Sequence, residues 1–284
     1  MNILNILDEI EKVDGEIYER INPRRAAMKD FFNMGKKVAV AAVPLALGSM
    51  FKKAYGQSTP TQVNEVLNFA LTLEYLEYAF YDNAVKVSGL IPSGAPIGAI
   101  TTIRNHELAH VNLLKGALGS AARTALVFDN FDFTAGGTFP TVFSDYVTFL
   151  KVATAFEDTG VRAYKGQATV LKKNAVLTTA LQIHSVEARH ASHLRQMLAA
   201  NGATGLKPWI SLGAGGVSND TGIAAVDPVY ARENTTSQLG INIVGINGNS
   251  SITAAAAAEC FDEGLSKAEV VTIANLFLKP GFKL

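Results

Sequence analysis

The sequence is poor in several features that mark large classes of protein. Its 284 residues include one cysteine, Cys260, which excludes an intramolecular disulfide framework and a metal site built from several thiolates. We expect this cysteine to be buried on a C-terminal helix as a small apolar residue. The 25 basic and 25 acidic residues leave no net charge, whereas nucleic-acid-binding domains usually carry a basic surface. The composition therefore argues against a nucleic-acid partner.

No long apolar run is available for a membrane span near the N-terminus, because residues 38–50 are too short and are interrupted by Pro44. This run follows a predicted amphipathic helix over residues 1–22 and the pair Arg24-Arg25, and it ends before small residues near Gly56. The order resembles a twin-arginine export signal, which predicts recognition by the export machinery and a periplasmic or envelope location. A retained N-terminal helix in a cytoplasmic protein is the alternative. We assign this region to residues 1–57.

Residues 58–203 have the apolar periodicity of four long helices. The first opens with a capping box from Thr59 to Gln62, with Pro60 in the first turn. The predicted helices cover about residues 60–88, 96–118, 140–171 and 175–201.

These helices form two related halves. The first helix of each half carries Ala-x3-Glu-x6-Tyr, and the second carries Ile-x3-Glu-x2-His-x3-Leu-x3-Leu. The matching positions are Ala70, Glu74 and Tyr81 with Ala153, Glu157 and Tyr164, then Ile103, Glu107 and His110 with Ile183, Glu187 and His190. Two repeated helix pairs predict an all-α protein built on an antiparallel four-helix bundle.

Residues 204–284 have a different composition, with glycine, serine, asparagine and threonine dominating from 211 to 251. We predict a long loop that wraps the bundle and is anchored by Trp209, Tyr230 and the segment 241–246. Two short helices are expected after it, over about 252–260 and 267–277.

The spacing of the two Glu-x-x-His pairs is informative because residues at i and i+3 share one helix face. Folding the two halves together brings four carboxylates and two imidazoles to the centre of the bundle, a ligand set that holds two metal ions. The predicted ligands are Glu74, Glu107, His110, Glu157, Glu187 and His190. Such ligands suit iron or manganese, and are compatible with zinc. Without cations, the carboxylates would repel one another in an apolar core.

Two further assignments depend on the repeat. Glu77 competes with Glu74 as a ligand, but the position that matches Glu77 is Gly160, so we assign Glu74 as the ligand. Glu77 then lies beside the ligands or faces solvent. Tyr81 and Tyr164 lie two turns after their glutamates and are the predicted catalytic residues, as donors to the carboxylates or to an oxygen species at the metals. Ordinary buried tyrosines with satisfied hydroxyls are the alternative.

These motifs resemble the ferritin-like superfamily, which includes rubrerythrins and manganese catalases. The runs 73–81, 106–110 and 187–191, together with Glu-Asn-Thr-Thr at 233–236, resemble more closely a bacterial ferritin-like family related to plant desiccation-associated proteins. The resemblance covers about residues 60–284. It implies a ferritin-like bundle with a dinuclear site; it does not imply assembly into a cage, and a homo-oligomer is one possible assembly.

Two functions are compatible with this sequence. The first is a redox protein of the cell envelope, in which two metal ions react with dioxygen or peroxide in ferroxidase, peroxidase or catalase-like turnover. The second is a non-enzymatic, exported protective or interaction protein whose metal site is structural or vestigial.

Overall fold

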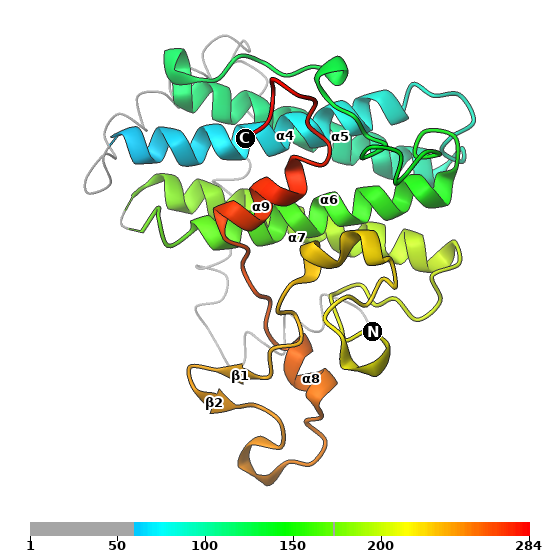
Figure 1. Cartoon of the computed structure of the whole chain (residues 1–284), viewed down its shortest axis with the longest axis vertical. Coiled ribbons are helices and arrows are strands. Elements are labelled where there is room, and N and C mark those ends of the chain that lie inside the picture. The colour runs from blue at the N-terminus through cyan, green and yellow to red at the C-terminus, as the bar shows by residue number, and fades with distance from the viewer. Residues whose placement is uncertain (1–59, 173) are drawn as a thin grey trace, which may run out of the picture. The chain divides into compact units, whose positions relative to one another are not determined.

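The computed structural model describes residues 60–172 and 174–284. The predicted N-terminal helix and export signal lie outside these residues and stay predictions. Within the described ranges no helix is both long and apolar enough to cross a membrane. The four long helices are α4 (Pro60–Ala84), α5 (Ala95–Leu118), α6 (Tyr146–Gln167) and α7 (Val176–Ala200) (Figure 1).

The four helices form two hairpins that pack side by side. Helix α4 packs along α5 and α6 packs along α7, while α4 lies beside α6 and α5 beside α7. The predicted all-α, antiparallel four-helix bundle is therefore confirmed.

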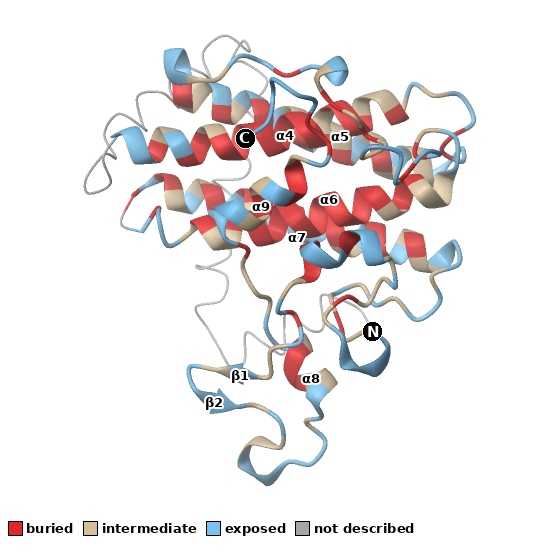
Figure 2. Ribbon diagram, in the orientation of Figure 1, coloured by how far each residue is buried: buried red, intermediate tan, exposed pale blue. Residues whose placement is uncertain are grey.

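In each hairpin the first helix is buried more completely than the second. In α4, 16 of 25 residues are buried and in α6, 16 of 22, against 7 of 24 in α5 and 9 of 25 in α7. A helix that is buried around most of its circumference needs cover on more than one side, and in α6 this buried surface includes Glu157, Asp158 and Arg162. The connection between α5 and α6 and the C-terminal segment lie over the outer sides of α4 and α6 (Figure 2). The ring of Phe80 lies at the centre of this core, stacked on Phe149 with ring centroids 5.0 Å apart.

Three boundaries of the long helices differ from the predicted ones. Helix α4 ends at Ala84 rather than near residue 88, and α6 covers Tyr146–Gln167 rather than residues 140–171. The start of α6 is set by Asp145, whose side chain accepts a hydrogen bond from the backbone N–H of Thr148 at 2.7 Å. The prediction missed this cap because the apolar pattern extends past it.

The chain after α7 is ordered but has little regular structure. Strands β1 (Ser237–Gln238) and β2 (Ile241–Asn242) pair antiparallel as a short hairpin. Helix α9 begins after Ser266, which forms a capping box with Glu269. The helices of this segment are α8 (Ala254–Glu259), α9 (Lys267–Ala274) and 3-10 helices over Ala214–Gly216, Ala224–Tyr230 and Ile246–Gly248; two more, Gly119–Ala121 and Phe128–Asn130, lie between α5 and α6.

One buried cluster attaches the post-bundle segment to α6 and α7. The fully buried Tyr230 donates its hydroxyl to Asp158 on α6 at 2.8 Å. Arg195 on α7 donates to the same carboxylate at 2.8 Å and also pairs with Asp220. Tyr230 is thus an anchor, as predicted.

A second cluster surrounds Arg162 on α6. Its guanidinium is fully buried, pairs with Glu233 at 2.9 Å and donates to the backbone carbonyls of Val229, Ala231 and Glu263. The Glu-Asn-Thr-Thr segment is therefore fixed to the bundle by its glutamate.

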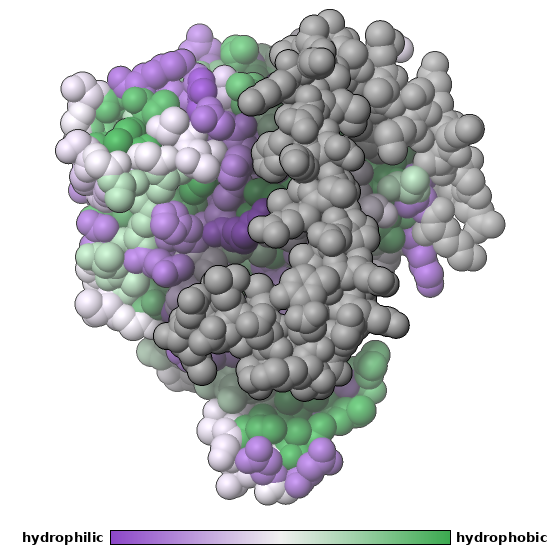
Figure 3. Space-filling view, turned by 180° about the vertical axis from the view of Figure 1, so that it is seen from behind, coloured by the Kyte–Doolittle hydropathy of each residue, from purple (hydrophilic) through white to green (hydrophobic). Residues whose placement is uncertain are grey.

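Three predictions about this segment are wrong. The side chains of Trp209 and Ile241 are 53% and 54% exposed, so neither is a buried anchor. Cys260 ends α8 and is exposed, because α8 is a short helix that packs on one side only. Exposed apolar side chains instead gather on the projecting end that carries the β-hairpin, where Leu239 and Val244 accompany Ile241 (Figure 3).

Candidate metal centre

The four long helices bring all six predicted ligand residues to one buried place. Helices α4 and α6 contribute one glutamate each, whereas α5 and α7 contribute a glutamate and a histidine one turn apart. The four carboxylates are fully buried and the two imidazoles are nearly so. The residues are Glu74, Glu107, His110, Glu157, Glu187 and His190.

One half of the cluster surrounds His110. Its Nδ1 lies 3.1 Å from an oxygen of Glu74, 3.0 Å from Glu107 and 3.1 Å from Glu187. An imidazole nitrogen carries at most one hydrogen, so it cannot donate to three carboxylates at once.

The other half surrounds His190. Its Nδ1 lies 3.1 Å from an oxygen of Glu157 and 3.0 Å from the second oxygen of Glu107. Each imidazole thus contacts the glutamate of the first helix in its own half, whereas Glu107 of α5 contacts both imidazoles.

The donor atoms fall into two groups, each within 4.8 Å. One group contains Glu74 and His110, the other contains Glu157 and His190, and Glu107 and Glu187 belong to both. Two shared carboxylates with one private glutamate and one private histidine on each side form the ligand set of a dinuclear site.

The cluster leaves carboxylate oxygens without hydrogen-bond donors. Among the described residues, both oxygens of Glu187 and one oxygen of Glu107 are buried without a properly oriented donor, although imidazole nitrogens lie within 3.1 Å of two of these three atoms. A buried anionic oxygen without a partner is costly. Cations bound between the carboxylates would satisfy these atoms, so the residues fit two metal ions.

In the absence of metal the same environment holds protons. Burial raises the pKa of Glu74 to about 7, against a lowering by His110, and burial and the charge of Glu107 raise the pKa of Glu187 well above its usual value. Burial lowers the pKa of His190, but the charges of Glu157 and Glu107 and the hydrogen bonds with them together outweigh burial and raise this pKa to about 10. Metal ions would therefore displace protons from these groups.

The two tyrosines cross between the halves. Tyr81 on α4 donates its hydroxyl to Glu157 on α6 at 2.7 Å, and Tyr164 on α6 donates to Glu74 on α4. Both hydroxyls therefore orient the private glutamates of the two groups. Their catalytic role stays a prediction.

Glu77 is buried rather than facing solvent, which excludes one of the two predicted positions. Its carboxylate lies beside Glu187, and a Cβ at Gly160 would come within 3.1 Å of an oxygen of each. The glycine that breaks the sequence repeat thus provides the room for a fifth buried carboxylate. Burial, and then the charge of Glu187, raise the pKa of Glu77 well above its usual value.

His106 is a further residue at the site that the sequence pattern did not single out. It is exposed, but its Nδ1 lies 2.9 Å from Nε2 of His190. The helix position of His106, next to Glu107, gave no signal of this contact, because the contact crosses from α5 to α7. His106 thus connects the outer nitrogen of His190 to the surface.

The comparison with known families agrees with this geometry. The family model described as a ferritin-like domain matches residues 62–200, a range that contains all six clustered residues. No curated protein and no solved structure matches the chain.

Proposed function

Residues 62–200 form a ferritin-like domain, and from this premise we propose that the chain is a dinuclear iron or manganese protein that reacts with dioxygen or hydrogen peroxide. The observation that carries the proposal is the sharing of Glu107 and Glu187 by two groups of buried donors. When bound, two such ions would supply the electrons and the Lewis acidity for this chemistry.

The chain itself contributes orientation and exclusion of water. The hydroxyls of Tyr81 and Tyr164 each hold one oxygen of a private glutamate. The other oxygen of each glutamate faces the histidine of the same donor group, on the side where a metal ion would bind. Because the carboxylates are fully buried, their electrostatic interactions are stronger than they would be in water.

Metal content and oxidant turnover test the proposal together. We expect the purified full-length protein to bind about two ions per chain, as the ferritin-like ligand set does. The iron(II)-loaded protein should then be oxidised by dioxygen or by hydrogen peroxide faster than free iron(II) under the same conditions. Elemental analysis and stopped-flow absorbance give the two readouts. Two bound ions with no reaction toward either oxidant would contradict the redox function.

One observation favours a second function as an interaction protein with a structural metal site. The projecting β-hairpin end exposes Leu239 completely, together with Ile241 and Val244. Exposed apolar residues gathered in this way mark contact surfaces. Two bound ions without turnover would support this alternative.

Removal of metal should destabilise the fold in a pH-dependent way. Glu74 keeps a proton in the folded, metal-free chain between its ordinary pKa of 4.5 and about 7, and His190 keeps one between 6.5 and about 10. Because the folded state binds more protons than the unfolded state, the free energy of unfolding falls as the pH rises, by up to about 1.4 kcal/mol per pH unit for each extra proton. Metal ions replace these protons, so in the metal-bound protein the free energy of unfolding should not fall as the pH rises.

Thermal unfolding between pH 5 and 8 checks this expectation, with a chelator in one series and saturating manganese in the other. The melting temperatures of the two series should diverge as the pH rises. Parallel curves would show that the cluster holds no metal in exchange for protons.

A further inference from the structure

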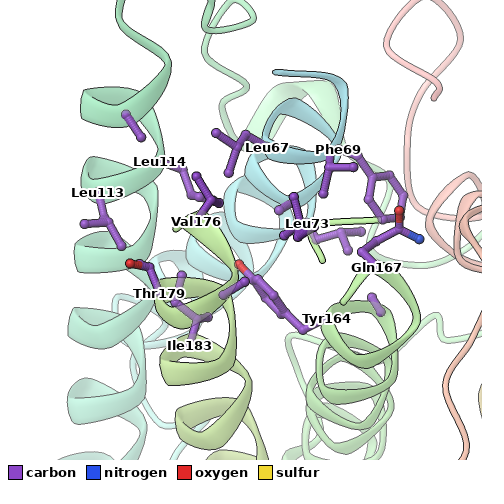
Figure 4. Close-up of a pocket in the computed structure, with 16 residues that line it drawn as sticks. Leu67, Phe69, Leu73, Leu113, Leu114, Tyr164, Gln167, Val176, Thr179 and Ile183 are labelled. Atoms are coloured by element: carbon purple, nitrogen blue, oxygen red, sulfur yellow. The ribbon is translucent and has the colours of Figure 1, made fainter. Parts of the chain in front are cut away.

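An apolar chamber adjoins the metal centre inside the bundle. Sixteen described residues from the four long helices and the turn after α6 line it, and thirteen of them are apolar. Figure 4 shows side chains from facing helices, among them Leu73, Leu114 and Ile183, converging on this space. Its volume of ≈ 20 Å³ slightly exceeds the ~10–15 Å³ that one water-sized molecule needs by the same measure. The chamber therefore has room for a very small molecule and not for a hydrocarbon chain.

One residue in the wall of the chamber reaches the metal centre. Tyr164 lines the chamber and donates its hydroxyl to Glu74. Leu73 directly precedes that glutamate, and Ile183 lies one helical turn before Glu187. A molecule in the chamber is thus separated from Glu74 by the tyrosine that donates to this carboxylate.

The lining does not suit water. A buried water needs two to four polar partners. The polar lining side chains are Tyr164, Gln167 and Thr179, and the hydroxyl hydrogen of Tyr164 is already donated to Glu74. Apolar cavities stay dry, and an engineered cavity of about 150 Å³ takes up xenon.

The chamber meets the surface on one side of the bundle. Of its lining residues, Leu113 and Ala117 on α5 and Thr179 on α7 are partly exposed, whereas the others are buried. A small molecule can therefore enter between α5 and α7 without passing the carboxylates.

We propose that this chamber binds dioxygen and admits it to the metal centre past Tyr164. The proposal rests on the proposed function and specifies its oxidant: dioxygen is small, uncharged and apolar, so it gains from this lining. Hydrogen peroxide has two O–H groups that would lose their hydrogen bonds there, which disfavours its entry. Binding and passage break no bond.

Xenon tests the chamber without metal. Xenon-129 NMR of the metal-free, full-length protein should show a bound xenon signal that is lost in Ala180→Leu, because this leucine fills the chamber from α7. Ala200→Leu makes the same change at the exposed end of α7 and should keep the signal. No bound xenon in the wild type would overturn the proposal.

Oxidation rates test the passage. In iron(II)-loaded Ala180→Leu with unchanged metal content, oxidation by dioxygen should slow by about tenfold, while oxidation by hydrogen peroxide should change by less than about twofold. Leu113→Trp, at the partly exposed opening, provides a second block if Ala180→Leu does not fold. Equal slowing with both oxidants, or no slowing with either, would overturn the passage.

The two proposals fail in different ways. A wild-type protein that binds metal and xenon but reacts with neither oxidant would refute the redox function, and dioxygen delivery with it. If the wild type reacts with dioxygen and both blocking variants react at the same rate, only the role of the chamber in admitting dioxygen is refuted.

Discussion

Glu187→Ala is expected to lower the metal content from about two ions per chain to nearly none. Glu187 belongs to both groups of donor atoms, so its loss removes a ligand from each ion at once. It also removes one of the four charges that would neutralise two divalent ions. Glu157→Ala, by contrast, removes a ligand from one group only and should leave about one ion bound.

Elemental analysis of the purified variants measures this difference, and Glu77→Gln is the matched control. Glu77 lies on α4, is buried and adjoins Glu187, but it belongs to neither donor group. The Glu77→Gln variant should therefore keep both ions, whereas the Glu74→Ala variant should lose one. Equal losses in the Glu74 and Glu77 variants would reject the assignment of Glu74, and full retention in Glu187→Ala would reject the shared-carboxylate site.

Arg162→Ala is expected to destabilise the fold by about 3–5 kcal/mol, the usual cost of breaking a buried ion pair from one side. The guanidinium is fully buried and is paired with Glu233, which is itself 4% exposed. Its removal leaves that carboxylate buried without its cation and three backbone carbonyls without their donor. The post-bundle segment should detach from α6 while the bundle keeps its helices.

Urea unfolding in the presence of a chelator measures the loss separately from any effect on metal. Arg232→Ala is the matched control, because this arginine lies next to Glu233 in the post-bundle segment and pairs with Glu269 at the surface. Exposed ion pairs contribute roughly 0–1 kcal/mol, so the control should be near wild type. Similar losses in the two variants would show that Arg162 is not a buried attachment point.

The periodicity along the chain was sufficient to predict the bundle and to place the six clustered residues on inward faces. Glu-x-x-His works locally, because the i and i+3 positions share a helix face whatever the neighbours are. The repeat then matched Glu74 with Glu157. Because Gly160 occupies the position that matches Glu77, the repeat favoured Glu74 over Glu77 as the ligand.

Contacts between helices could not be predicted in this way, because they depend on which elements become neighbours. The sharing of Glu107 and Glu187 and the crossing of each tyrosine to the other half follow from how the two hairpins pack. The same is true of His106, which reaches His190 on another helix although its own position gave no sign of it.

Sequence patterns also did not predict the buried ion pairs between the bundle and the post-bundle segment. Arg162 and Arg195 look like surface residues of amphipathic helices, yet both are buried because the later segment brings Glu233, Asp220 and backbone carbonyls to them. Charged residues can be buried only when partners are present. Local periodicity thus determined which face of each helix is apolar, and the tertiary structure alone decided which charges meet inside it.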